Sequence, residues 1–264
     1  MKIGKSGKQE NRKKKLHKGI YILPNIFTSL NIFCGYYSVI SSLDRNFVAA
    51  AVAIIIAAVF DTLDGKIARA TNTTSKFGIE YDSLADIISF GFAPGLMIYL
   101  WALEPLGRIG WLAAFLFLVC GALRLARFNA QASNSPSTYF TGLPIPAAAG
   151  MNATMVLFLH RIEIFEANPV FLLVFLYFLS FLMVSTIKYE SLKRPELLKR
   201  MKFNNLVVVI LVLIFIAAEP SVTLFILAVA YTISGLINFV RQKKSEACDI
   251  EELNSDDIFM GLKK

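Results

Sequence analysis

Four aspartates lie in the stretch FDTLDGKIARATNTTSKFGIEYDSLAD, which covers residues 60–86. Asp61 and Asp64 are three residues apart and Asp82 and Asp86 are four apart, so each pair falls on one face of a helix. The stretch adjoins runs that are apolar enough to cross a bilayer, where a carboxylate is expensive to bury. Something must therefore hold these four side chains, and that partner should indicate the chemistry.

The connection TNTTSKFGIE (71–80) is polar, and it lets the two helices lie side by side as antiparallel neighbours. All four carboxylates would then meet at one depth, where their charges repel one another unless divalent cations neutralise them. Oxygen ligands without His or Cys indicate Mg²⁺ or Mn²⁺, and Ca²⁺ is also compatible. We expect two ions, which could polarise a phosphoryl group and leave one carboxylate to activate a hydroxyl.

Gly65, Ala68 and Arg69 refine this hypothesis. The two small residues let a ligand approach the helix backbone, and Arg69 is a fixed cation suited to a phosphate. Metal ions and an arginine at a membrane surface indicate a phosphorylated, lipid-linked substrate. Intramembrane acids also mark ion pathways, so a cation transporter is the alternative from another class of protein. Clustering at one end of two consecutive helices favours a surface site.

The composition indicates an integral membrane protein. Of the 264 residues, 56% are hydrophobic and 17% are charged, and the mean hydropathy is +0.58, which is too apolar for a soluble domain of this size. A bilayer core about 30 Å thick needs about 20 apolar residues per helix. We therefore expect an all-α, polytopic membrane helix bundle with about eight transmembrane helices. Their expected ranges are 22–43, 47–69, 83–104, 109–127, 144–160, 168–187, 204–218 and 221–240.

The charges indicate how the chain is divided and oriented. We expect a basic cytoplasmic arm (1–18), a transmembrane catalytic domain (19–244) and an acidic cytoplasmic tail (245–264) that could form a short amphipathic helix. If the N-terminus is cytoplasmic and the helices alternate, both termini and the aspartates face the cytoplasm. All but three of the 27 Lys and Arg residues then lie on that side, as the positive-inside rule predicts. The net charge of +8 therefore indicates contact with membrane lipids and no nucleic-acid partner.

The aspartate stretch resembles the signature of the CDP-alcohol phosphatidyltransferase family, and all eight signature positions match. They are Asp61, Asp64, Gly65, Ala68, Arg69, Gly78, Asp82 and Asp86. The resemblance implies a six-helix core with a dinuclear metal site, where a CDP-linked lipid donates its phosphatidyl group to an alcohol and releases CMP. It implies that Asp61, Asp64 and Asp82 are metal ligands and that Asp86 is both a ligand and the catalytic base. It also implies that Gly65 and Ala68 line the cytidine site and that Arg69 binds phosphate.

Four further stretches are similar to the branch of this family that uses serine, which implies CDP-diacylglycerol and L-serine as substrates. They are LPNIFTSLNIFCG (23–35), DSLADIISFGFAPG (82–95), CGALRLARFN (120–129) and GLPIPAAAG (142–150). Arg124, Arg127, Asn129 and Lys188 are expected at the depth of the aspartates, where they could bind a serine zwitterion. The same cations could instead anchor the helices at the interface, or hold the phosphate of glycerol-3-phosphate or inositol phosphate. A homodimer is a possible assembly.

Overall fold

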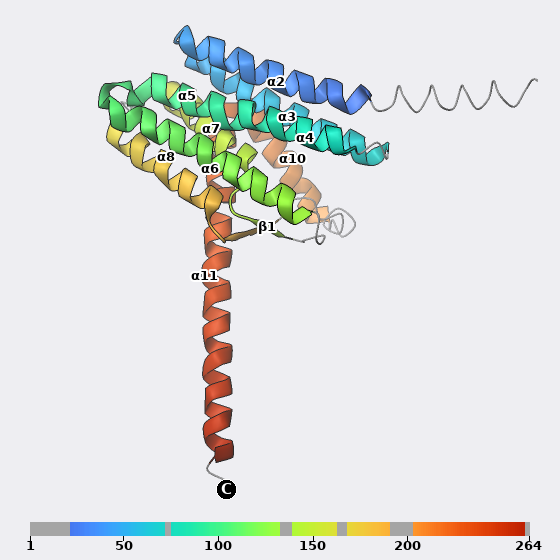
Figure 1. Cartoon of the computed structure of the whole chain (residues 1–264), viewed down its shortest axis with the longest axis vertical. Coiled ribbons are helices and arrows are strands. Elements are labelled where there is room, and N and C mark those ends of the chain that lie inside the picture. The colour runs from blue at the N-terminus through green and yellow to red at the C-terminus, as the bar shows by residue number, and fades with distance from the viewer. Residues whose placement is uncertain (1–21, 72–74, 133–138, 163–167, 191–202, 262–264) are drawn as a thin grey trace, which may run out of the picture.

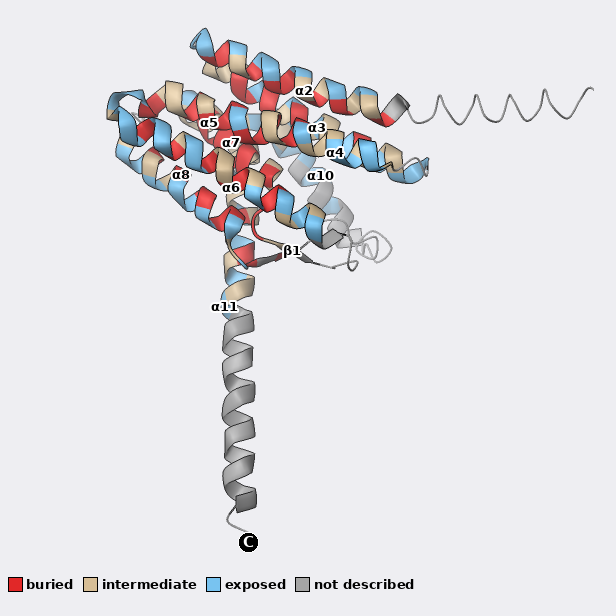
Figure 2. Cartoon of the chain, in the orientation of Figure 1, coloured by how far each residue is buried: buried red, intermediate tan, exposed pale blue. Residues whose placement is uncertain are grey.

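The computed structural model describes residues 22–71, 75–132, 139–162, 168–190 and 203–261 (Figure 1). Every expected helix is present in these ranges, which confirms the predicted all-α membrane bundle. The helices are α2 (Ile22–Leu43), α3 (Phe47–Ala70), a continuous helical stretch from Lys76 to Leu106, α6 (Arg108–Ala132), α7 (Ile145–Ile162), α8 (Pro169–Val184), α10 (Phe203–Ala218) and α11 (Pro220–Gly261). Buried residues follow the inward faces of the bundle helices and exposed residues follow the outward faces (Figure 2).

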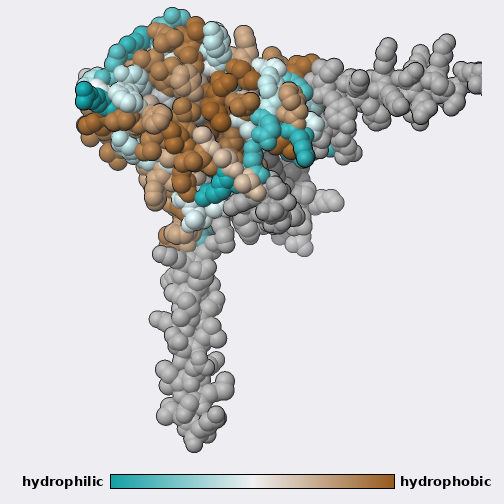
Figure 3. All heavy atoms as spheres, viewed as in Figure 1, coloured by the Kyte–Doolittle hydropathy of each residue, from teal (hydrophilic) through white to brown (hydrophobic). Residues whose placement is uncertain are grey.

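Five of the helices are long and apolar enough to cross a membrane. The spans are Pro24–Leu43, Phe47–Ala70, Lys76–Leu106, Arg108–Ala130 and Pro220–Val240, and the apolar helix Pro169–Val184 is shorter. On the face shown in Figure 3, apolar residues cover the middle of the bundle, and hydrophilic residues gather towards its ends. The protein is therefore an integral membrane protein.

The third membrane helix starts earlier than expected and changes its winding part-way along. Ser75 caps its first segment, α4 (Lys76–Asp86), by accepting a hydrogen bond from the backbone N–H of Gly78 at 3.0 Å. The π-helical segment η1 (Ile87–Phe92) follows, and the backbone N–H of Ala93 reaches back to the carbonyl of Ile88. α5 (Ala93–Ile98), the π-helical η2 (Tyr99–Leu103) and the 3₁₀ turn η3 (Glu104–Leu106) complete the helix. Pro94 has no N–H to continue an α-helical ladder, which explains the wider turn before it.

α2 crosses the third helix at very short range. Gly35 packs directly against Ser89 of η1, and the Ser89 hydroxyl donates to the Asn31 carbonyl at 2.9 Å. Small residues at a helix crossing let backbones approach closely, and a hydroxyl can then bond across the contact. This crossing fixes the position of the helix that carries Asp82 and Asp86.

Two ion pairs join loops that are expected on the outer side. Arg45 pairs with Glu104 at 2.7 Å and also donates to the Leu100 carbonyl at 2.6 Å. Arg161 pairs with Glu219 at 3.1 Å, beside the turn between α10 and α11. Two of the three cations expected outside are therefore paired with acids of neighbouring loops.

A short antiparallel ribbon joins the other end of the bundle to α11. β1 (Tyr139–Thr141) pairs with β2 (Lys188–Glu190), and Tyr189 of β2 is fully buried. Its ring packs on Gly235 and lies 5.8 Å from the ring of Tyr231 in α11. Burial raises the pKa of Tyr189 to about 12, so its hydroxyl is neutral at physiological pH.

The ribbon and α11 correct two expectations. Lys188 belongs to β2, opposite Thr141, because α8 ends at Val184 and not at residue 187. α11 continues through most of the expected tail to Gly261, where a short separate helix was expected. The division into arm, membrane domain and tail stays a prediction.

The Gly35 crossing gives a test of the fold. Gly35→Ala should destabilise the protein by about 1–3 kcal/mol, because the added Cβ would collide with Ser89. Gly150→Ala in α7 is the matched control, since no atom of the described residues lies within 4 Å of an added Cβ there. The control should be neutral or stabilising by about 0.4–1 kcal/mol. Thermal unfolding in detergent measures both, and equal effects would contradict the close crossing.

Candidate metal and substrate site

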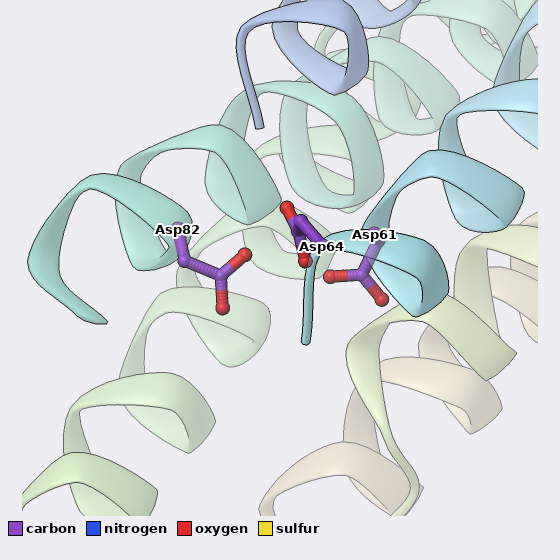
Figure 4. Close-up of side chains that lie close together, drawn as sticks. All are labelled: Asp61, Asp64 and Asp82. Atoms are coloured by element: carbon purple, nitrogen blue, oxygen red, sulfur yellow. The ribbon is translucent and has the colours of Figure 1, made fainter. Parts of the chain in front are cut away.

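Three of the four aspartates form a compact cluster between two helices. Asp61 and Asp64 of α3 and Asp82 of α4 each bring a carboxylate oxygen within 4.8 Å of the others. Figure 4 shows the three carboxylates extending from their helices into the space between them. The paired spacing along each helix, together with the antiparallel arrangement, produces this convergence. The cluster is therefore a group of carboxylates that could hold a metal ion.

Asp64 is the most enclosed member of the cluster. Its side chain is 4% exposed, and the Thr28 hydroxyl of α2 donates to its Oδ2 atom at 2.8 Å. Thr28 itself is buried, so α2 forms a third wall of the site. Thr28 is a site residue that the sequence alone did not predict. The signal was present, because a threonine in an apolar helix places its hydroxyl either on its own backbone or on a buried partner.

Asp86 lies beside this cluster rather than within it. Its side chain is 8% exposed and lies within hydrogen-bonding distance of Asp61. One of its oxygens, Oδ1, is buried without a hydrogen-bond partner among the described residues. An oxygen in that state is available to a ligand or to a substrate proton.

The donor set fits a hard divalent cation. Its donors are carboxylate oxygens, the ligands that Mg²⁺, Mn²⁺ and Ca²⁺ prefer. Within the described ranges, neither Asp64 nor Asp86 forms an ion pair, and the Arg45 and Arg161 pairs lie at the other end of the bundle. Arg69 and Arg124 act electrostatically on Asp64 and Asp86 without forming ion pairs with them, so a bound metal ion would supply the close positive charge that these two buried side chains lack.

A pocket of about 160 Å³ opens next to Asp64 and Asp82. It contains Gly65, Ala68 and Arg69, the three residues expected on the donor side, and the Arg69 guanidinium lies over Gly65 at about 3.4 Å from where a Cβ would be. The rest of its lining comes from the start of α2 and from the cap of α4: Pro24, Asn25, Thr28, Ser75, Gly78 and Ile79. The pocket thus joins the acidic cluster to the residues that could bind a phosphorylated group.

The expected serine-binding residues are placed very differently from one another. Arg124 is 6% exposed and interacts electrostatically with Asp86 and Tyr231. Its Nε atom has no hydrogen-bond partner, and the described residues provide it with no ion pair. Asn129 donates to the Ser83 hydroxyl at 2.9 Å, which ties α6 to α4.

Arg127 joins structural elements together. Its guanidinium donates to the carbonyls of Val184 at 3.1 Å, Thr141 at 3.0 Å and Ser185 at 3.2 Å. These bonds attach α6 to the C-terminal end of α8 and to the ribbon. Of the four residues expected to bind serine, the structure brings Arg124 to Asp86, whereas Arg127 is engaged by backbone carbonyls. Lys188 lies in β2, and the placement of its side chain is outside the described part.

Known proteins share most of this chain. A protein of Helicobacter pylori named CDP-diacylglycerol–serine O-phosphatidyltransferase is 40% identical over 222 residues, which are 84% of this chain and 92% of that protein. A Bacillus subtilis protein with the same name is 38% identical over 172 residues, 65% of this chain and 92% of its own length. The archaetidylserine synthase of Methanothermobacter thermautotrophicus is 38% identical over 169 residues, 63% of this chain and 69% of that protein.

A family match covers the whole site. Residues 21–187 match the CDP-alcohol phosphatidyltransferase family, and this segment runs from α2 to the end of α8. It contains all four aspartates, the pocket beside them and Arg124, and it includes six helices, the number that the resemblance in the sequence implied for the core. The chain therefore belongs to the CDP-alcohol phosphatidyltransferase family.

Proposed function

We propose that this protein transfers the phosphatidyl group of CDP-diacylglycerol to the hydroxyl of L-serine and releases CMP. Family membership supports the transfer, and two of the relatives above carry the name of this reaction. The observation that carries the choice of acceptor is Arg124, a buried guanidinium that lacks an ion pair among the described residues and lies near Asp86. A substrate carboxylate would complete it.

The donor binds at the acidic cluster and its pocket. Asp61, Asp64 and Asp82, with Asp86, hold divalent ions, which we expect to be two Mg²⁺ or Mn²⁺. Ions held there supply positive charge that polarises the phosphoryl group and neutralises the departing phosphate. Gly65 and Ala68 leave room for the cytidine part of the donor, and Arg69, which also lines the pocket, binds its phosphate.

Asp86 acts as the base. Its buried, unpartnered oxygen accepts the proton of the serine hydroxyl, and the hydroxyl oxygen attacks the phosphorus that carries diacylglycerol. The bond from this phosphorus to the oxygen of the CMP phosphate breaks, and CMP leaves with the bonding electron pair. The products are phosphatidylserine, CMP and a proton on Asp86, which returns to solvent.

Arg124 orients the acceptor by binding its carboxylate. A bidentate guanidinium–carboxylate pair is strong and directional, and burial at 6% exposure strengthens it further. A polyol phosphate carries more negative charge than a carboxylate and would call for more than one cation. Arg127 is committed to backbone carbonyls, so the described residues near Asp86 suit a singly charged group better.

We also propose that the site and both chain ends face the cytoplasm. The distribution of Lys and Arg supports this orientation, with Arg45, Arg108 and Arg161 as the three exceptions. Pairing of Arg45 and Arg161 with Glu104 and Glu219 reduces the charge of the outer loops.

Replacing the cluster aspartates tests the metal hypothesis. Asp61→Asn, Asp64→Asn, Asp82→Asn and Asp86→Asn should each lower kcat/KM at least about 100-fold, because a preorganised charge next to the phosphoryl group is lost. Chelation with EDTA should abolish CMP release, and Mg²⁺ or Mn²⁺ should restore it. Thr62→Ala is the control, since Thr62 is exposed on α3 and donates only to its own helix at the Ala58 carbonyl. Full turnover by metal-free protein would refute the role of the cluster.

Two neighbouring arginines test the acceptor hypothesis. Arg124→Lys keeps the charge but loses the fork, so the KM for serine should rise about tenfold or more while the KM for CDP-diacylglycerol changes little. Arg127→Lys should instead lower the melting temperature, because three carbonyls lose donors, and leave the serine KM near its wild-type value. If Arg127→Lys raised the KM for serine and Arg124→Lys did not, Arg127 would be the residue that binds the acceptor carboxylate. Steady-state kinetics with labelled CDP-diacylglycerol and a panel of serine, glycerol-3-phosphate and inositol phosphate gives these values and identifies the acceptor.

Cysteine accessibility tests the orientation. In a background without Cys34, Cys120 and Cys248, Asp44→Cys should react with an impermeant thiol reagent applied to intact cells. Thr71→Cys should react only after the membrane is opened. Both positions are exposed in the structure and lie at opposite ends of α3, so they differ mainly in the side they face. Labelling of Thr71→Cys from outside would place the site on the wrong side for a cytoplasmic donor.

A further inference from the structure

Asn31 is a fully buried polar side chain that the reaction above does not use. Its exposed fraction is 0%, and neither its carboxamide oxygen nor its nitrogen has a hydrogen-bond partner among the described residues. A buried amide in that state has given up its bonds to water without replacement, which destabilises the fold. Packing alone would be better served by leucine at this position.

The helix pair α2 and α3 places Asn31 at the depth of Asp61. Asn31 follows Thr28 by one turn on the same face of α2, and Thr28 bonds Asp64 of α3 at 2.8 Å. The two helices are antiparallel, because only residues 44–46 connect them. One turn forward along α2 therefore corresponds to one turn back along α3, which is the step from Asp64 to Asp61.

The third helix brings Asp86 to the same place. Ser89, one turn after Asp86, donates to the Asn31 carbonyl at 2.9 Å, so this turn of η1 lies against Asn31. Asp86 is within hydrogen-bonding distance of Asp61 and has one buried oxygen without a partner. The Asn31 backbone thus lies against the turn that follows Asp86, and the helix register places its side chain one turn from the Thr28–Asp64 contact, at the depth of Asp61.

We propose that Asn31 is a contact residue of the acceptor subsite, where its carboxamide hydrogen-bonds the polar head of the acceptor beside Asp86. Carboxylates only accept hydrogen bonds, whereas a carboxamide both donates and accepts. An amino-acid alcohol offers ammonium donors together with hydroxyl and carboxylate acceptors, so Asn31 supplies a pairing that the acidic cluster lacks. The assignment rests on the proposed transfer reaction, and serine is the acceptor class it fits.

Asn31→Leu removes both polar atoms while keeping the number and the branching of the side-chain heavy atoms. The KM for serine should rise about tenfold or more, the KM for CDP-diacylglycerol should stay within about twofold, and the melting temperature should be unchanged or higher. Asn31→Ser supplies a hydroxyl that can donate and accept a hydrogen bond. Its KM for the substrate serine should therefore lie between the values of the wild type and of Asn31→Leu. If Asn31→Leu does not fold, the KM of Asn31→Ser for the substrate serine still tests whether Asn31 contacts the acceptor.

Asn152 of α7 provides a matched control. It is likewise 0% exposed, with neither carboxamide atom hydrogen-bonded among the described residues. Ile145 of the same helix packs on Gly91, beyond Asp86 along the third helix, and Asn152 lies about two turns further along α7. Asn152→Leu should therefore reproduce the effect on stability while leaving both KM values unchanged.

Three outcomes would overturn the assignment. An unchanged serine KM in Asn31→Leu would make Asn31 structural. A lower kcat with both KM values unchanged would assign Asn31 to the metal cluster, and a raised KM for CDP-diacylglycerol would assign it to the donor. Wild-type protein that ignores serine would refute the proposed function instead, and the same comparison would then be made with the acceptor that the wild type uses.

Discussion

The constraint on which this structure depends is the repulsion among four carboxylates held at one end of a membrane bundle. Asp64 and Asp86 are buried, and the described residues give them no ion pair. Burying isolated charges in such a place costs free energy, so other groups must compensate for them. Two antiparallel helices present the pairs to each other, α2 adds the Thr28 hydroxyl, and the remaining negative charge is left for divalent ions. The substrate pocket opens directly beside the charge that those ions would supply.

Rigid helix contacts keep these groups in place. Gly35 lets α2 press against Ser89, and Pro94 accounts for the π-helical turn that begins directly after Asp86. At the far side, Arg127 fastens α6 to α8 and the ribbon, so that Arg124, one turn earlier, is held level with Asp86. The segment matched to the family ends with α8, whereas α11 packs on the ribbon through Tyr189 and Gly235. α10 and α11 are therefore additions to a core that already contains the acidic cluster.

Local patterns in the sequence predicted most of this arrangement. Apolar runs marked every described membrane helix, and the i, i+3 and i, i+4 spacing of the aspartates predicted their convergence. The sequence could not separate Arg124 from Arg127, because both lie near one end of α6 and differ only in what the rest of the chain brings to them. Carbonyls of Val184 and Thr141 reach Arg127 through tertiary packing that no local pattern encodes. The early end of α8 was missed for a similar reason: the following residues pair with β1, which is distant in sequence.

Three helices that pack near Asp86 each carry a buried polar group without a partner, in addition to those that Ser38, Asn152 and Tyr189 carry elsewhere. Its own Oδ1, the Nε of Arg124 and the carboxamide of Asn31 each lack a hydrogen-bond partner among the described residues, and they approach from three different helices. Each of these unpaired groups lowers the stability of the fold without ligand, and an apolar side chain in its place would remove that cost. Groups of opposite and complementary character that remain unsatisfied around one point are better explained by a small polar molecule that all three bind than by three separate defects in packing. Binding that molecule would recover the lost hydrogen bonds together, which gives the acceptor its affinity and fixes its hydroxyl beside the base.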